Sequence, residues 1–148
     1  MADLAAALRQ HERIGVDTPI FIYHLEGTTH LAGLAGVALD ELAGGAFTGM
    51  TSVLTLMEIA VKPLHMGRPD VAEEYEILLA NYPNLVMAAI DRPTARRAAE
   101  LRAEYRLRPA DALQVGACLE QGATAFLSND RELRRITDLH VWMLEDFV

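Results

Sequence analysis

The hydrophobic positions of this 148-residue chain fall into short apolar runs that alternate with longer stretches of helical spacing. Short apolar runs bounded by turn residues are typical of buried strands, and apolar residues three or four positions apart are typical of amphipathic helices. We expect strands over 13–16, 46–50, 84–90, 124–128 and 140–144. We expect helices over 3–12, 19–25, 30–42, 53–66, 70–81, 94–105 and 109–121, with a helical turn at 131–135.

Several helix boundaries have a local chemical signal. Asp3 and Ser52 are side chains that cap helix N-termini, and Pro19 suits the first helical position. Gly44 and Gly45 follow the expected end of the second long helix. Pro63 falls inside an expected helix, where it should produce a kink.

Strands that alternate with helices indicate an α/β fold with a parallel sheet of four to five strands and helices on its faces. No repeat, linker or low-complexity tract divides the chain, so we expect one domain over 1–148, with 1–12 as a helical N-terminal extension. In such folds ligands bind beyond the carboxyl ends of the strands.

Four acidic residues stand out against this expected topology. Asp17 and Asp130 each follow an expected strand, so they share one edge of the sheet. Glu58 lies in an apolar helical stretch, where burial without a partner is costly, and Asp111 lies in the first turn of a helix, which favours its ionised form. Each also has an ordinary explanation, as a turn, capping or outward-facing residue, and only together do they predict a site.

Carboxylates that converge repel one another unless a cation joins them. Oxygen ligands select hard divalent ions, so the expected cofactor is Mg²⁺ or Mn²⁺. Such an ion can activate water and stabilise charge on a phosphoryl oxygen, which predicts hydrolysis of phosphodiester bonds.

The ordered motifs resemble those of the PIN-domain family, which includes the VapC-like toxins of bacterial toxin–antitoxin pairs. The matching segments are Val16-Asp17-Thr18, the run 51–59 with Val61-Lys62-Pro63-Leu64, Pro109-Ala110-Asp111-Ala112-Leu113-Gln114, and Phe126-Leu127-Ser128-Asn129-Asp130. Each motif is short, but their order spans nearly the whole chain. One departure is the dozen residues before the first strand, where family members usually begin almost at that strand.

The resemblance implies a Rossmann-like PIN fold and a Mg²⁺- or Mn²⁺-dependent endoribonuclease. It places the family's acidic residues at Asp17, Glu58, Asp111 and Asp130, as metal ligands and catalytic groups. Ser128 is implied as a supporting hydroxyl, with Asn129 as a weaker neighbour. The implied partners are an RNA substrate, a small antitoxin protein and a second copy of the chain in a homodimer.

Two other functions of α/β proteins do not fit the same residues. A phosphatase of the haloacid-dehalogenase type needs a second aspartate at the position of Pro19, and a response-regulator receiver needs a lysine near its last strands, whereas the single lysine is Lys62. The alternative that stays open is a catalytically silent PIN-like module that acts in protein assembly.

Charge and composition limit the modes of binding and the cellular location that we expect. The net charge of −8 argues against a binder that holds nucleic acid by positive charge alone. Arg131 and Arg134 follow Asp130 and are candidates for contacts to substrate phosphates. The single cysteine, the lack of a secretory signal and the lack of a long apolar run predict a cytoplasmic protein without a membrane segment.

Overall fold

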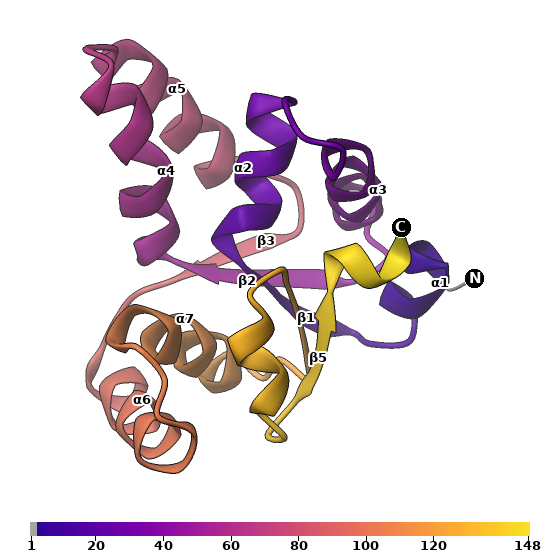
Figure 1. Ribbon diagram of the computed structural model, residues 1–148, viewed down its shortest axis with the longest axis vertical. Helices are drawn as coiled ribbons and strands as arrows, with labels where there is room; N and C mark the ends of the chain where they lie inside the picture. Colours follow the sequence, from indigo (N-terminus) through magenta and orange to yellow (C-terminus); the bar gives the residue numbers. More distant parts are fainter. Residues whose placement is uncertain (1–2) are drawn as a thin grey trace.

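The computed structural model describes residues 3–148 as a five-stranded parallel sheet with helices on both faces (Figure 1). The strand order is β3-β2-β1-β4-β5, and all four pairings are parallel. The strands are β1 (Arg13–Val16), β2 (Thr48–Ser52), β3 (Leu85–Ala88), β4 (Ala125–Ser128) and β5 (His140–Met143). The expected α/β class and parallel sheet are therefore confirmed.

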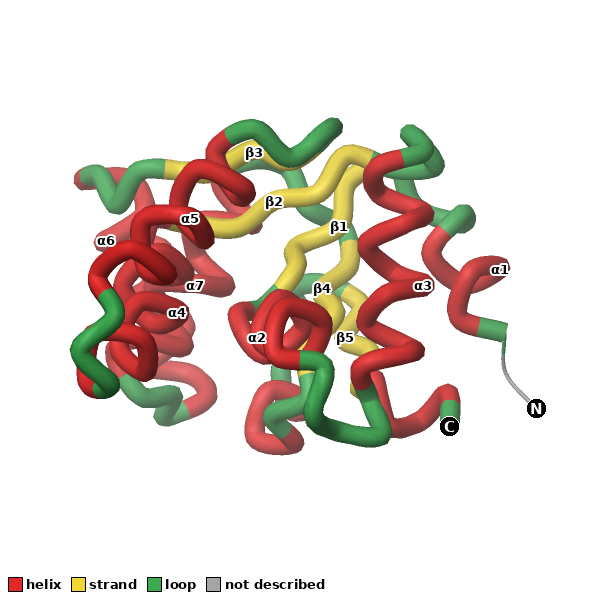
Figure 2. The backbone as a smooth tube through the Cα atoms, turned by 90° about the horizontal axis from the view of Figure 1, so that it is seen from above, coloured by secondary structure: helices red, strands yellow, loops and turns green. Residues whose placement is uncertain are grey.

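The helices cover the sheet in two layers. In Figure 1, α6 and α7 lie together on one face of the sheet, and α2 and α3 lie on the other. The α-helices are α1 (Leu4–Leu8), α2 (Thr18–Glu26), α3 (Ala32–Ala43), α4 (Val53–His65), α5 (Pro69–Ala80), α6 (Arg92–Tyr105) and α7 (Pro109–Glu120). Two 3-10 helices follow, η1 (Arg131–Arg135) and η2 (Leu144–Phe147). The α4–α5 pair projects from the molecule in Figure 1, and Figure 2 shows it at the opposite end from α1 and α3.

Strand β1 shows how the alternation of side chains builds two cores. Ile14 and Val16 are buried in the cluster beneath α2 and α3. Gly15 faces the opposite core, where a Cβ would lie 2.4 Å from Cδ1 of Phe126 and 2.9 Å from Sγ of Cys118. A side chain at position 15 has no room, because Phe126 of β4 and Cys118 of α7 already fill the space above the strand.

Most expected elements match the structure, with shifts at their ends. The N-terminal helix is shorter than expected, covering Leu4–Leu8, although Asp3 caps it as expected by accepting from the Ala6 amide. Met1 and Ala2, which also belong to the expected extension, lie outside the described residues. Strand β2 begins two residues later than expected, after Gly45 has turned the chain with a positive φ of 85°.

No helix within residues 3–148 combines the length and the apolar character that a membrane crossing would require.

The register at the centre of the sheet determines where the acidic residues lie. Val16 of β1 pairs with Leu127 of β4, and the Asp17 amide donates to the Leu127 carbonyl at 3.0 Å. Asp17 and Ser128 therefore leave adjacent strands at the same carboxyl edge.

Candidate active site

Asp17 is a nearly buried carboxylate at the centre of the carboxyl edge. It caps helix α2, and its Oδ1 accepts from the Thr18 amide at 2.9 Å. Its Oδ2 accepts from the Ser128 hydroxyl at 2.6 Å. Only 8% of the residue is exposed. Both oxygens are thus held in fixed directions by short local contacts.

The environment of Asp17 is unfavourable for a lone negative charge. Burial raises its pKa from 3.8 to about 7, against the opposing effect of the Ser128 and Thr18 hydrogen bonds. The negative charges of Asp111 and Glu58 raise the same pKa further. The structure therefore brings three of the four predicted acids within electrostatic reach of one another.

Glu58 reaches the site from helix α4, which begins directly after β2. Its Oε1 accepts from the Thr18 hydroxyl at 2.8 Å, so the residue after Asp17 orients a second acid. The helical stretch around it is apolar in sequence but open in the structure: Glu58 is exposed, and Met57 and Val61 are 56% and 60% exposed. Met57 and Val61 therefore form an exposed apolar surface beside Glu58, whereas Ile59 on its other side is buried in the core.

Asp111 and Asp130 are joined by an arginine. Nε of Arg108 lies 3.0 Å from Oδ2 of Asp111, and its Nη2 lies 3.0 Å from Oδ2 of Asp130. The Asp130 amide donates to the Ser128 hydroxyl at 3.1 Å. Ser128 therefore connects Asp130 to Asp17, and Arg108 connects Asp130 to Asp111. The same arginine was not among the residues selected from the sequence.

A buried polar network lies behind the acids and was also missed. The Thr55 hydroxyl lies 2.9 Å from the Thr18 hydroxyl and 2.7 Å from the Thr51 hydroxyl. The side-chain amide of Gln114 donates to the Thr55 hydroxyl at 3.0 Å and to the Thr51 hydroxyl at 3.2 Å. The Ser52 hydroxyl donates to Oε1 of the Gln114 side chain. A sequence signal for this network existed, since Gln114 stands one helical turn after Asp111 in an otherwise apolar helix.

The other selected residues lie around this centre. Ser128 contacts Asp17 as a supporting hydroxyl would. The Asn129 side chain instead donates to the Tyr23 hydroxyl at 3.3 Å and accepts from the Glu145 amide at 3.1 Å, which ties the loop to η2. Among residues 3–148, the hydrogen bonds of the Asn129 side chain are therefore structural and go to none of the four acids.

Arg131 and Arg134, selected as possible phosphate contacts, are both paired with acids of η2. Nε of Arg131 lies 2.7 Å from Oε1 of Glu145, and Nη2 of Arg134 lies 2.7 Å from Oδ1 of Asp146. Their role toward phosphate stays a prediction. The basic residues that lie beside the acids are Arg106, Arg108 and Arg135. With Leu107, Asp111, Asp130 and Glu132 they line a hollow of about 360 Å³.

The side chains of the site offer carboxylate and hydroxyl oxygens, which are ligands that a hard divalent ion prefers. Within residues 3–148, however, no group of three or more His, Cys, Asp or Glu side chains is arranged so that it could hold an ion. The Asp111 and Asp130 carboxylates face the Arg108 guanidinium, which already supplies a positive charge between them. The guanidinium shows that this pair of acids accepts a cation.

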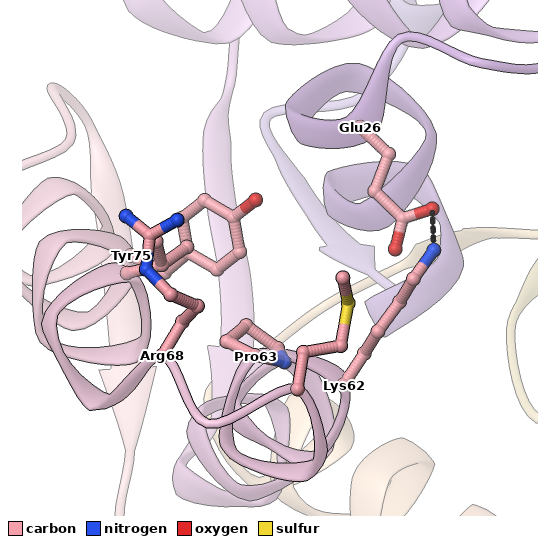
Figure 3. Close-up of a pocket in the computed structure, with 7 residues that line it drawn as sticks. Glu26, Lys62, Pro63, Arg68 and Tyr75 are labelled. Atoms are coloured by element: carbon pink, nitrogen blue, oxygen red, sulfur yellow. Dashed lines mark hydrogen bonds and ion pairs between the residues drawn. The ribbon is translucent and has the colours of Figure 1, made fainter.

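A second surface feature lies at the projecting α4–α5 end. A pocket of about 160 Å³ is lined by residues from α2, α4, α5 and the turn between α4 and α5, among them Pro63, Met66 and Tyr75. The Lys62–Glu26 ion pair, with Nζ and Oε2 3.3 Å apart, also lines it (Figure 3). Helix α4 also exposes apolar side chains at helical spacing, namely Val53, Met57, Val61 and Leu64. We call these four residues the α4 apolar stripe.

Comparison with known proteins agrees with the fold. The chain resembles the VapBC2 complex of Rickettsia felis bound to a promoter DNA fragment (TM-score 0.70, 16% identity, 88% of this chain and 98% of that chain). It also resembles a toxin–antitoxin complex from Klebsiella pneumoniae (TM-score 0.68, 20% identity, 88% and 97%) and DNA-bound VapBC from Salmonella typhimurium (TM-score 0.66, 17% identity, 89% and 98%). No curated protein matches the sequence. The model of the PIN domain matches residues 14–139, and the chain belongs to the PIN domain family.

Proposed function

We propose that this protein is a Mg²⁺- or Mn²⁺-dependent endoribonuclease that hydrolyses phosphodiester bonds in RNA. The observation that carries the proposal is Asp17, a nearly buried carboxylate whose pKa is raised to about 7 by burial and by the charges of Asp111 and Glu58. Such perturbed acids gather at functional sites. Carboxylates held close together lower the stability of a folded protein, so we expect such an arrangement where it serves a function.

The residues of the site have different roles in this proposal. Asp17, Glu58, Asp111 and Asp130 would hold the ion after their side chains turn toward it, because no three of them within residues 3–148 are arranged to do so. An ion bound there would activate a water as nucleophile and stabilise negative charge on the phosphoryl oxygen. Ser128 holds Asp17 in one orientation, and the Thr18 hydroxyl does the same for Glu58. Fixing ligand oxygens in this way reduces the reorganisation that ion binding requires.

The test is Mn²⁺-dependent cleavage of RNA by the wild type and by Asp17→Asn. Asp91→Asn is a matched control, because Asp91 also caps the helix that follows a strand but lies outside the site. We expect cleavage by the wild type and the control, abolished by EDTA, and a loss of at least about a hundredfold in Asp17→Asn. Equal cleavage by wild type and Asp17→Asn, once contaminating nuclease is excluded, would overturn the enzymatic function. A folded wild type without cleavage would favour the silent binding module.

We further propose that the protein is the toxin of a toxin–antitoxin pair. The structures it resembles include toxin–antitoxin complexes. The α4 apolar stripe and the neighbouring pocket offer an apolar docking surface beside the acidic site. A small antitoxin whose tail crosses this surface and places an arginine among the carboxylates would fit both features. Residues 1–80 carry 11 acidic and 4 basic side chains, which favours a basic partner segment.

Co-expression with a neighbouring small gene tests the partner. We expect the small product to co-purify with this protein and to suppress its RNA cleavage and its toxicity. Strong expression of the protein alone without any effect on growth would count against the toxin role. Light scattering of the purified protein tests the homodimer that we expect from the family resemblance.

A further inference from the structure

Arg108 contacts the site from the solvent side and binds two of the proposed metal ligands. It precedes Pro109 at the start of α7, and its side chain is 75% exposed, whereas those of Asp111 and Asp130 are 21% and 25% exposed. Within residues 3–148 these two carboxylates are the only hydrogen-bond partners of its side chain. The guanidinium is therefore held in place by the acids alone.

The contact to Asp130 uses the one oxygen of that residue that is not already engaged in capping. Oδ1 of Asp130 accepts from the Glu132 amide at 3.0 Å and so caps η1. Oδ2 is left for a cation, and Arg108 donates to it at 3.0 Å. Any ion that Asp130 binds through this oxygen must share it with the guanidinium.

Sharing is unfavourable for two reasons. A guanidinium and a divalent ion on the same oxygens repel each other at contact distance, where Coulomb energies are largest. The donors of Arg108 also lie along directions in which the carboxylates would bind the ion. The Arg108 guanidinium carries its charge at any physiological pH, as arginine side chains in proteins do.

We propose that Arg108 is an internal counter-ion of the carboxylate site, which a divalent ion must displace from Asp111 and Asp130. Arg108 thereby sets the ion concentration at which the site fills. This inference rests on the proposed function.

A purely structural role for Arg108 makes a different prediction. The residue links the start of α7 to the loop after β4, and this link could simply hold the two acids in place. Loss of such a link would weaken ion binding, because the acids would lose their alignment. Loss of a competing cation would strengthen it. The direction of the change in ion affinity separates the two roles.

The experiment is a calorimetric Mn²⁺ titration of the wild type, Arg108→Gln, Arg108→Lys and Arg135→Gln. Arg135 lines the same hollow but pairs with Glu132 at 3.1 Å, so its variant removes an equal charge without touching either acid. We expect Arg108→Gln to bind Mn²⁺ about three- to tenfold more tightly, as the loss of exposed ion pairs allows. Arg108→Lys should fall between, because an ammonium lacks the planar fork. Arg135→Gln should stay within about twofold of the wild type.

A second readout follows the arginine directly. In a Mg²⁺ titration of the wild type, the Nε–H resonance of Arg108, assigned by its loss in Arg108→Gln, should shift in step with ion binding. An unchanged resonance at saturation, or equal or weaker Mn²⁺ affinity in Arg108→Gln, would overturn this inference and leave the proposed function standing. If neither protein binds Mn²⁺ at millimolar concentration, the metal-dependent function falls as well. Binding by Arg108→Gln alone would support the inference most strongly.

Discussion

The hydroxyl of Ser128 donates to Oδ2 of Asp17 across 2.6 Å and so joins the carboxyl ends of two adjacent strands, β4 and β1. The same hydroxyl accepts from the Asp130 amide at 3.1 Å. One buried side chain therefore fixes the orientation of one proposed ligand and the backbone of another. This arrangement predicts that Ser128 affects the chemistry of the site as well as its packing.

Ser128→Ala should reduce Mn²⁺-dependent cleavage by about ten- to a hundredfold, the usual effect of removing a residue that orients a ligand. The hydroxyl lowers the pKa of Asp17, so its loss should raise that pKa above 7. The acidic limb of the pH–rate profile should then move to higher pH. A lower rate with an unmoved limb would show that Ser128 acts only on the loop of Asp130.

The raised pKa of Asp17 also predicts how stability depends on pH without metal. Between its ordinary value of 3.8 and about 7, the folded protein holds a proton on Asp17 that the unfolded chain has released. The contribution of this group to stability is thus fully present below pH 3.8 and is lost as pH rises through 7. In EDTA at pH 8, Asp17→Asn should be more stable than the wild type, on the order of 2–4 kcal/mol.

Urea unfolding of both proteins between pH 4.5 and pH 8 measures this difference. The gap should shrink toward the acidic end, because the wild-type carboxyl is protonated there. A wild type that is the more stable protein at pH 8 in EDTA would contradict the raised pKa. Saturating Mn²⁺ should reverse the order at pH 8, because the ion stabilises only a folded state that binds it.

The sequence was sufficient to predict the strands of the parallel sheet and to place Asp17 and Asp130 at the ends of two of them. Alternating apolar runs predicted the strands, and parallel pairing placed Asp17 and Asp130 at one edge, where the structure has them. The bounds of β2 were less accurate, because the apolar pair 46–47 precedes the strand and packs as part of the turn after Gly45. Local apolar content does not distinguish these two cases.

Contacts between distant segments could not be predicted in the same way. Arg108 binds Asp130, 22 residues later, and Gln114 binds Thr51, 63 residues earlier. These pairs depend on how α7 is placed against β2 and β4, which the pattern of any one segment does not encode. The exposure of Met57 was missed for a related reason, since an apolar helical stretch has the same spacing on a core face as on a docking surface.

Gln114 should contribute strongly to stability. Gln114→Leu would leave the hydroxyls of Thr51, Thr55 and Ser52 with fewer partners in a buried site, at a cost of about 1–3 kcal/mol. Gln121→Leu is the control, because Gln121 lies exposed at the end of the same helix. Urea unfolding should show a lower midpoint for Gln114→Leu and little change for Gln121→Leu. Equal midpoints would mean that the network adds nothing to stability.

Gly15 should not tolerate a side chain. Its Cβ would overlap Phe126 and Cys118, so Gly15→Ala should destabilise the fold by about 1–3 kcal/mol through overpacking. Gly33→Ala should instead be neutral or stabilise by up to about 1 kcal/mol, because position 33 is helical and its Cβ meets nothing within 4 Å. Thermal unfolding of the two variants gives opposite shifts if α7 packs on β1 as described.

The α4 apolar stripe should matter for the partner and not for the fold. Leu64 is 55% exposed, so Leu64→Glu should change neither the unfolding midpoint nor the rate of RNA cleavage by more than about twofold. In a complex that covers the stripe, the same change places a charge in an apolar interface and should weaken antitoxin binding by at least about tenfold. Val37→Glu, at a 40% exposed position of α3 away from the stripe, is the matched control. Loss of inhibition by the antitoxin in Leu64→Glu alone would place the partner on α4, whereas equal inhibition of both variants would remove the stripe from the interface.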